Sequence, residues 1–188
     1  PERGTGPPEL HHSEGRYPYD TLLSDLQRLK ITRLLVDGYP PLAMLDAASE
    51  LGLPVLPLNS LRMASVAGES FPLPATTDLA LLLQTSGTTS QPKVVPLSHA
   101  NLLASARSVA EVLELGPDDR SLAAMPLFHI HGIVATLLAP LVASGSVVCC
   151  RSNAPHALLA ALESLKPTWF SAVPTLLQGL LAELDRNG

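Results

Sequence analysis

Residues 85–93 are the part of the sequence whose residue types most clearly suggest chemistry. They read Thr-Ser-Gly-Thr-Thr-Ser-Gln-Pro-Lys, with five hydroxyl side chains, one glycine and one lysine in nine residues. Backbone N–H groups and short hydroxyls donate hydrogen bonds to phosphate oxygens, and an ammonium group neutralises their charge. Apolar runs at residues 79–83 and 94–97 flank the segment. A phosphate loop and a simple polar hairpin turn between two strands are therefore both open interpretations.

Two better-known phosphate loops do not match this segment. A Walker loop needs a second glycine before the lysine, a hydroxyl residue after it and a helix directly behind it. Here Val94 follows Lys93, and the next residues favour a short strand. The dinucleotide fingerprint G-x-G-x-x-G is also absent from the sequence. If the segment binds phosphate, it is a loop of another kind.

The surrounding sequence alternates between apolar strands and amphipathic helices. Strands are expected near residues 33–36, 54–57, 79–83, 94–97, 121–125, 146–150 and 168–173, and helices near 20–29, 40–51, 98–113, 132–143, 158–165 and from 174 onward. This order predicts an α/β fold with a mostly parallel sheet and helices on both faces. Such sheets bind ligands beyond the carboxyl ends of their strands. We therefore expect the loops at 85–93, 126–132 and 174–175 to gather at one rim.

The composition excludes several classes of function. The 188 residues carry 12 basic and 17 acidic side chains, and the basic residues are scattered rather than clustered. Neither a nucleic-acid partner nor a polybasic membrane surface is expected. Residues 121–150 contain no Asp, Glu, Lys or Arg, but two histidines, Gly132 and Pro140 interrupt them. They are better interpreted as strand, loop, helix and strand than as a transmembrane segment.

The two cysteines, Cys149 and Cys150, are adjacent in the sequence. Neighbouring side chains of a strand point to opposite faces, so a disulfide between them would be strained. We expect two free thiols and a cytoplasmic or other reducing intracellular location.

Three segments resemble, in the right order, motifs of the adenylate-forming (AMP-binding) superfamily. This superfamily comprises acyl-CoA synthetases, luciferases and the adenylation domains of peptide synthetases. Residues 85–93 resemble its TSGTTGxPKG loop, residues 125–132 (MPLFHIHG) its PLFHxxG segment, and residues 170–176 (FSAVPTL) its VP segment. The resemblance covers roughly residues 22–184. The Thr-Thr pair and the PLFHIHG segment look closer to acyl-CoA synthetases, including oxalate–CoA ligase-like members, than to peptide synthetases.

The resemblance implies an ATP-dependent acid–CoA ligase. In that family a small carboxylic acid attacks the α-phosphorus of ATP, acyl-AMP forms, and coenzyme A takes the acyl group; Mg²⁺ assists. The resemblance assigns the ATP phosphates to Thr85, Ser86, Gly87, Thr88, Thr89 and Lys93. It assigns the acid pocket to His129, Gly132, Val134 and Thr136. An amino-acid or aryl-acid adenylation domain and a non-catalytic phosphate-binding module remain alternatives.

The sequence also departs from the family pattern. Ser90 and Val94 stand where glycine is usual, which puts the efficiency of phosphate binding in question. The later motifs for adenine and ribose, and the C-terminal domain with the catalytic lysine, have no match after Pro174. We therefore expect a flexible leader at 1–19 and a partial N-terminal AMP-binding domain at 20–188, inactive alone and prone to self-association through exposed edges. We interpret His131 as a packing residue, and Asp118 and Asp119 as a solvated turn.

Overall fold

The computed structural model describes residues 19–38, 40–60, 72–85, 93–150 and 152–187. All of the expected leader except residue 19 lies outside this part of the chain. The contacts divide the chain into two compact units, residues 1–70 and 71–188, and each is described by itself. The single partial domain expected over residues 20–188 is thus built as two units, and its boundaries stay a prediction.

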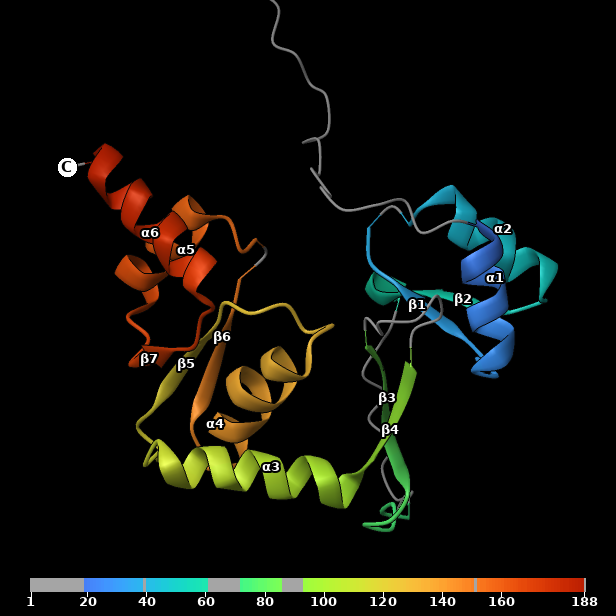
Figure 1. The fold of residues 1–188 in the computed structure, drawn as a ribbon, viewed down its shortest axis with the longest axis horizontal. Coiled ribbons are helices and arrows are strands. Elements are labelled where there is room, and N and C mark those ends of the chain that lie inside the picture. The colour runs from blue at the N-terminus through green and yellow to red at the C-terminus, as the bar shows by residue number, and fades with distance from the viewer. Residues whose placement is uncertain (1–18, 39, 61–71, 86–92, 151, 188) are drawn as a thin grey trace, which may run out of the picture. The chain divides into compact units, whose positions relative to one another are not determined.

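The first unit is a strand–helix–strand motif preceded by a helix (blue to teal in Figure 1). Its elements are α1 (Tyr19–Arg28), β1 (Leu34–Val36), α2 (Leu42–Glu50), β2 (Val55–Pro57) and the 3-10 turn η1 (Leu58–Ser60). β1 and β2 pair in parallel, as the predicted crossover requires. The hydroxyl of Tyr19 donates a hydrogen bond to the carboxylate of Glu50 and so links α1 to the end of α2.

The second unit opens with a hairpin of β3 (Leu79–Thr85) and β4 (Lys93–Ser98). The two strands are antiparallel, and among the described strands they pair only with each other. The common rim was expected if all the strands are parallel neighbours in one sheet, and that condition does not hold for this pair, which instead forms the hairpin that the sequence left open. The physical reason is the short connection, since seven residues can join antiparallel neighbours but a parallel pair needs a crossover of a dozen residues or more.

Helix α3 (His99–Val112) follows the hairpin directly. Its predicted N-cap is confirmed, because the Ser98 hydroxyl accepts a hydrogen bond from the N–H of Asn101 at 3.2 Å. The Asn101 side chain in turn accepts from the N–H of Ser98 at 3.0 Å, which completes a capping box. This arrangement ends β4 and starts the helix within one residue.

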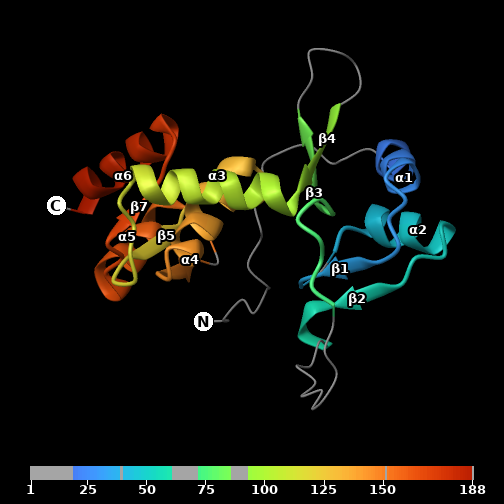
Figure 2. The ribbon, with the colours of Figure 1, turned by 90° about the horizontal axis from the view of Figure 1, so that it is seen from below.

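A three-stranded parallel sheet forms the centre of the second unit (Figures 1 and 2). β5 (Arg120–Ala123) lies between β6 (Ser146–Cys149) and β7 (Trp169–Phe170). Leu122 of β5 packs against Leu158 and Leu180, which lie on α5 (Pro155–Leu165) and α6 (Pro174–Asn187). The preceding Ser121 points to the other face and donates to the Thr136 carbonyl in the π-helix η2 (Gly132–Leu138). Helices therefore cover both faces of this sheet, as predicted.

The remaining helix, α4 (Ala139–Val142), continues η2 and leads into β6. The α/β class predicted from the sequence is thus confirmed, although the described strands form three small sheets instead of one. The last strand is also shorter than the predicted 168–173, since only Trp169–Phe170 pairs with β5. Among the described residues no helix is both long and apolar enough to cross a membrane. Cys149 and Cys150 are free thiols.

Candidate functional site

The hairpin β3–β4 carries the two ends of the predicted phosphate loop. Thr85 and Lys93 are paired across the ladder, and both side chains are exposed. The other predicted phosphate ligands, Ser86, Gly87, Thr88 and Thr89, lie outside the described residues. The polar hairpin and the phosphate loop, which the sequence left as alternatives, are therefore compatible, because the loop connects two paired strands.

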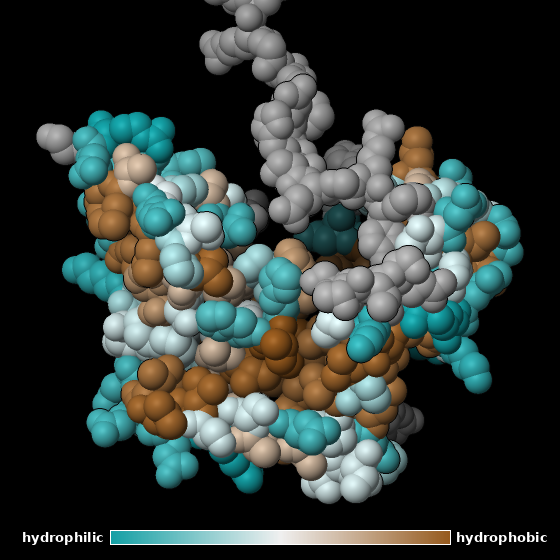
Figure 3. Space-filling view, in the orientation of Figure 1, coloured by the Kyte–Doolittle hydropathy of each residue, from teal (hydrophilic) through white to brown (hydrophobic). Residues whose placement is uncertain are grey.

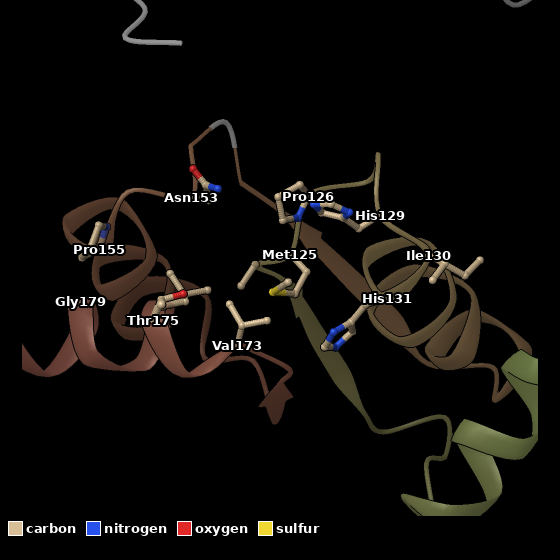
Figure 4. A pocket seen from close by; sticks show the side chains of 12 residues that line it. Met125, Pro126, His129, Ile130, His131, Asn153, Pro155, Val173, Thr175 and Gly179 are labelled. Atoms are coloured by element: carbon tan, nitrogen blue, oxygen red, sulfur yellow. The ribbon is translucent and has the colours of Figure 1, made fainter. Parts of the chain in front are cut away.

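A cavity of about 690 Å³ lies at the carboxyl ends of the three parallel strands. Its wall takes residues that follow each strand: Met125 and His129 after β5, Asn153 after β6, and Val173 and Thr175 after β7. Figure 4 shows these side chains arranged around one space. Carboxyl ends of parallel strands share one edge of a sheet, so this position is where an α/β fold places a ligand. Two of the three loops expected at one rim do meet there; the third includes the undescribed loop residues.

His129 is the predicted pocket residue that lines this cavity. Its side chain is exposed, and its ring lies 4.4 Å from the ring of Phe128, centroid to centroid, at a tilt of 51°. The aromatic neighbour restricts the imidazole without using its nitrogens. His129 can therefore donate or accept a hydrogen bond to a molecule in the cavity.

Gly132, Val134 and Thr136 are buried, and none of them is among the lining residues of the cavity. A Cβ at Gly132 would lie 2.2 Å from the Pro126 carbonyl oxygen, so this glycine allows η2 to approach the loop after β5. The Thr136 hydroxyl donates to the Gly132 carbonyl at 2.7 Å. In the described structure Gly132 packs against the loop that carries lining residues, and the contact of all three residues with an acid stays a prediction.

His131 is a residue that the sequence analysis undervalued. Its Nε2 lies 2.7 Å from the Ser171 hydroxyl, and its side chain lines the cavity. The interpretation as a packing residue was incomplete, because the imidazole joins two segments 40 positions apart. The sequence features that could have pointed to this bond were the second histidine of the segment 125–132 and the serine of the segment 170–176.

Asp119 lies at the opposite, amino end of β5 and is more than a solvated turn. Its carboxylate accepts hydrogen bonds from the Gly116 N–H and the Thr168 hydroxyl, each at 2.8 Å. These bonds, the Gly116 bond first, lower the pKa of the carboxyl group, and partial desolvation opposes them. Asp119 thus ties the start of β5 to the segment before β7.

The described residues contain no group of three or more His, Cys, Asp or Glu side chains that could hold a metal ion. Mg²⁺ is often held by one or two protein carboxylates together with substrate phosphates.

A family model described as AMP-binding enzyme matches residues 18–187. The chain belongs to the AMP-binding enzyme family. It is 40% identical over 120 residues to an oxalate–CoA ligase of Saccharomyces cerevisiae, covering 63% of this chain and 22% of that protein. It is 34% identical over 174 residues to an oxalate–CoA ligase of Arabidopsis thaliana, covering 92% of this chain and 31% of that protein.

A solved structure agrees with the fold. O-succinylbenzoate coenzyme A synthetase from Bacillus subtilis, in complex with AMP, superposes with a TM-score of 0.72 and 28% identity over 90% of this chain and 44% of that one. The α/β fold of this chain is therefore that of part of an adenylate-forming enzyme. The chain spans between about a fifth and a third of the length of the two oxalate–CoA ligases.

Proposed function

We propose that this chain supplies the phosphate loop and part of the acid pocket of an ATP-dependent acid–CoA ligase. The observation that carries the proposal is the cavity at the carboxyl ends of β5, β6 and β7, which the PLFHIHG segment and the VP segment line together. Both segments resemble motifs of the adenylate-forming superfamily. The CoA-ligase names of the relatives favour this function over an amino-acid or aryl-acid adenylation domain.

The proposed reaction has two steps. A carboxylate oxygen of the acid attacks the α-phosphorus of ATP, the bond to the bridging oxygen breaks, and pyrophosphate leaves with the electron pair. The thiol of coenzyme A then attacks the acyl carbon, loses its proton and displaces AMP. When bound with ATP, Mg²⁺ neutralises phosphate charge.

The hairpin residues have a defined task in the first step. Negative charge grows on the pyrophosphate as it leaves, and positioned donors that meet this charge lower the barrier. We assign this task to Lys93 and to the hydroxyl of Thr85, together with Ser86, Gly87, Thr88 and Thr89 of the loop. Lys93 is exposed on a paired strand, so its ammonium is available and its backbone is held.

The acid is proposed to bind in the cavity beside His129. The described wall is mainly apolar, with Met125, Val173 and Leu176 among its residues, and His129 and Thr175 add polar groups. Such a lining suits an acid whose carboxylate meets the polar groups while an apolar body fills the remaining space. An aromatic acid such as ferulate is therefore expected to be activated better than oxalate.

The proposal is tested by acid-dependent exchange of labelled pyrophosphate into ATP, followed by detection of the CoA thioester. The assay uses the longest natural form of the protein that carries this chain. We expect exchange with ferulate and thioester formation when coenzyme A is added. Failure of every acid to support exchange would contradict the proposal, and exchange without a thioester would favour the adenylation-domain alternative. The 188 residues alone are expected to give no exchange, because half a nucleotide site does not orient ATP.

A further inference from the structure

We propose that His131 is a positioning residue whose hydrogen bond to Ser171 holds the two walls of the cavity at the spacing that the acid requires. This inference rests on the proposed function for the identity of the ligand. The bond itself rests on geometry, with 2.7 Å between His131 Nε2 and the Ser171 hydroxyl oxygen. That distance lies at the short end of the range for hydrogen bonds to nitrogen.

The bond joins two segments that lie beyond the last backbone pair of β5 and β7. One wall comes from the loop after β5 and carries His129; the other comes from the segment after β7 and carries Val173 and Thr175. β7 has two residues, and its ladder with β5 ends at the pair Leu122 and Phe170. Ser171 is the first residue beyond that ladder, so its side chain continues the connection that the backbone no longer makes.

The backbone next to His131 is closely packed. His131 directly precedes η2, and the next residue, Gly132, is packed against the loop backbone with no room for a side chain. His131 is therefore held close to the backbone of Pro126, at the base of the loop that carries His129. A change in the position of Ser171 is transmitted through His131 to the wall that faces the acid.

The chemistry of the pair suits a permanent connection. A neutral imidazole can accept the Ser171 hydroxyl proton or donate to its oxygen, and an imidazolium can still donate. The bond engages Nε2, and His131 and Ser171 are both half-buried. Its function is thus to position the walls, while His129, which has an exposed ring, remains free to contact the acid.

The first test compares two amides of different reach at position 131. The terminal amide of glutamine reaches about as far as histidine Nε2, and that of asparagine stops short. Hydrogen exchange is measured for the backbone amides of residues 171–173 and 175–177 in the 188-residue chain. His131→Asn and Ser171→Ala are expected to speed this exchange roughly two- to tenfold. His131→Gln and Ser171→Thr are expected to keep the exchange as slow as in the unsubstituted chain. The amides of the buried Leu122 and Leu158 report whether each variant keeps its core.

The second test asks whether the bond serves the acid. In the longest natural form of the protein, His131→Asn is expected to raise KM for the acid roughly two- to tenfold, with KM for ATP unchanged. His156→Asn, on the exposed side of α5, is the matched control and should change neither value. The double variant His131→Asn/Ser171→Ala should behave like either single variant, since both remove the same bond.

Each outcome decides a separate point. Unchanged exchange in His131→Asn and Ser171→Ala, or additive effects in the double variant, would overturn the inference. Faster exchange with an unchanged KM for the acid would reduce the bond to a purely structural one and overturn the positioning role. Hydrogen exchange needs no substrate, so a failure of the proposed function would appear only as missing pyrophosphate exchange and would leave the first test decisive.

Discussion

Lys93 lies directly opposite Thr85 in the antiparallel ladder of β3 and β4, at the end of the hairpin from which the serine- and threonine-rich loop extends. The pairing fixes the backbone of the one lysine in the motif while its side chain stays exposed. A cation held in this way can meet a phosphate without first ordering its own backbone.

Replacement of Lys93 therefore tests the hairpin as a phosphate site. Lys93→Ala is expected to lower the rate of acid-dependent pyrophosphate exchange by about 10²-fold in the longest natural form of the protein, because a positioned donor to the leaving group is lost. Lys93→Arg keeps the charge and should lose less. Lys30→Met, at an exposed lysine of the first unit, serves as the control. An exchange rate in Lys93→Ala equal to that of the control would remove Lys93 from the site.

Gly132 offers a test of the wall behind the cavity. An added Cβ would lie 2.2 Å from the Pro126 carbonyl oxygen and 2.9 Å from that of Met125, and neither backbone atom can rotate away. Gly132→Ala should therefore lower the free energy of unfolding by about 1–3 kcal/mol, as overpacking typically does. Urea denaturation of the chain measures the change. Gly116→Ala is the matched control, since nothing lies within 4 Å of its added Cβ, and equal stability of the two variants would contradict the close approach.

The hydrogen bonds of Asp119 predict that the free energy of unfolding depends on pH. The Gly116 N–H and then the Thr168 hydroxyl hold the pKa of this carboxyl group below its ordinary value of 3.8. A group with a lowered pKa in the folded state contributes stability above its unfolded pKa and loses it as the pH falls through the folded value. The unfolding free energy of Asp119→Asn should thus lie below that of the unsubstituted chain at pH 7 and pH 5, with the gap closing toward pH 3 and below.

Urea denaturation at these pH values measures the gap, and Asp118→Asn provides the control. Asp118 is an exposed neighbour with the same charge, so its replacement controls for the loss of one negative charge at this turn. Thr168→Val removes one of the two hydrogen-bond donors to Asp119. In a chain that carries Thr168→Val, the further change Asp119→Asn should therefore lower the free energy of unfolding by less at pH 7 than it does in the unsubstituted chain. A gap that stays constant from pH 7 to pH 3 would show that Asp119 acts through packing alone.

Self-association of the 188-residue chain is a further prediction. Three leucines follow one side of α6, and their exposed fractions are 43% for Leu177, 62% for Leu181 and 52% for Leu184. Hydrophobic surface is visible in Figure 3 at the place that α6 occupies in Figure 1. Exposed apolar stripes of this kind favour contact with a second copy.

Light scattering on a concentration series is expected to show a mass that rises with protein concentration. The triple variant Leu177→Gln, Leu181→Gln and Leu184→Gln should shift the series toward the mass of a single chain, 19.8 kDa. A triple exchange of exposed Glu111, Glu114 and Glu163 to Gln is the control for a change of three side chains outside α6. A strictly monomeric parent chain over the whole series would contradict the prediction.

The sequence by itself determined which elements form and what chemistry to look for. Apolar periodicity placed α3 and α6, Ser98 marked the start of α3, and the motifs at 85–93, 125–132 and 170–176 led to the family that the comparisons confirm. These features could be predicted because they depend on residues within a few positions of each other. The parallel pairing of β1 with β2 also followed, since a strand–helix–strand order leaves little choice.

Only the tertiary structure decided which strands share a sheet and which side chains meet. The Asp119–Thr168 bond and the His131–Ser171 bond each join residues about 40 to 50 positions apart, so no local pattern contains them. Gly132 shows the same difference. Its place in a motif could be recognised from the sequence, but the Pro126 carbonyl that leaves no room for a side chain there belongs to a loop whose path is set by packing. Contacts between distant residues arise when whole elements bury their apolar faces against one another. Which faces meet depends on the packing of the complete fold.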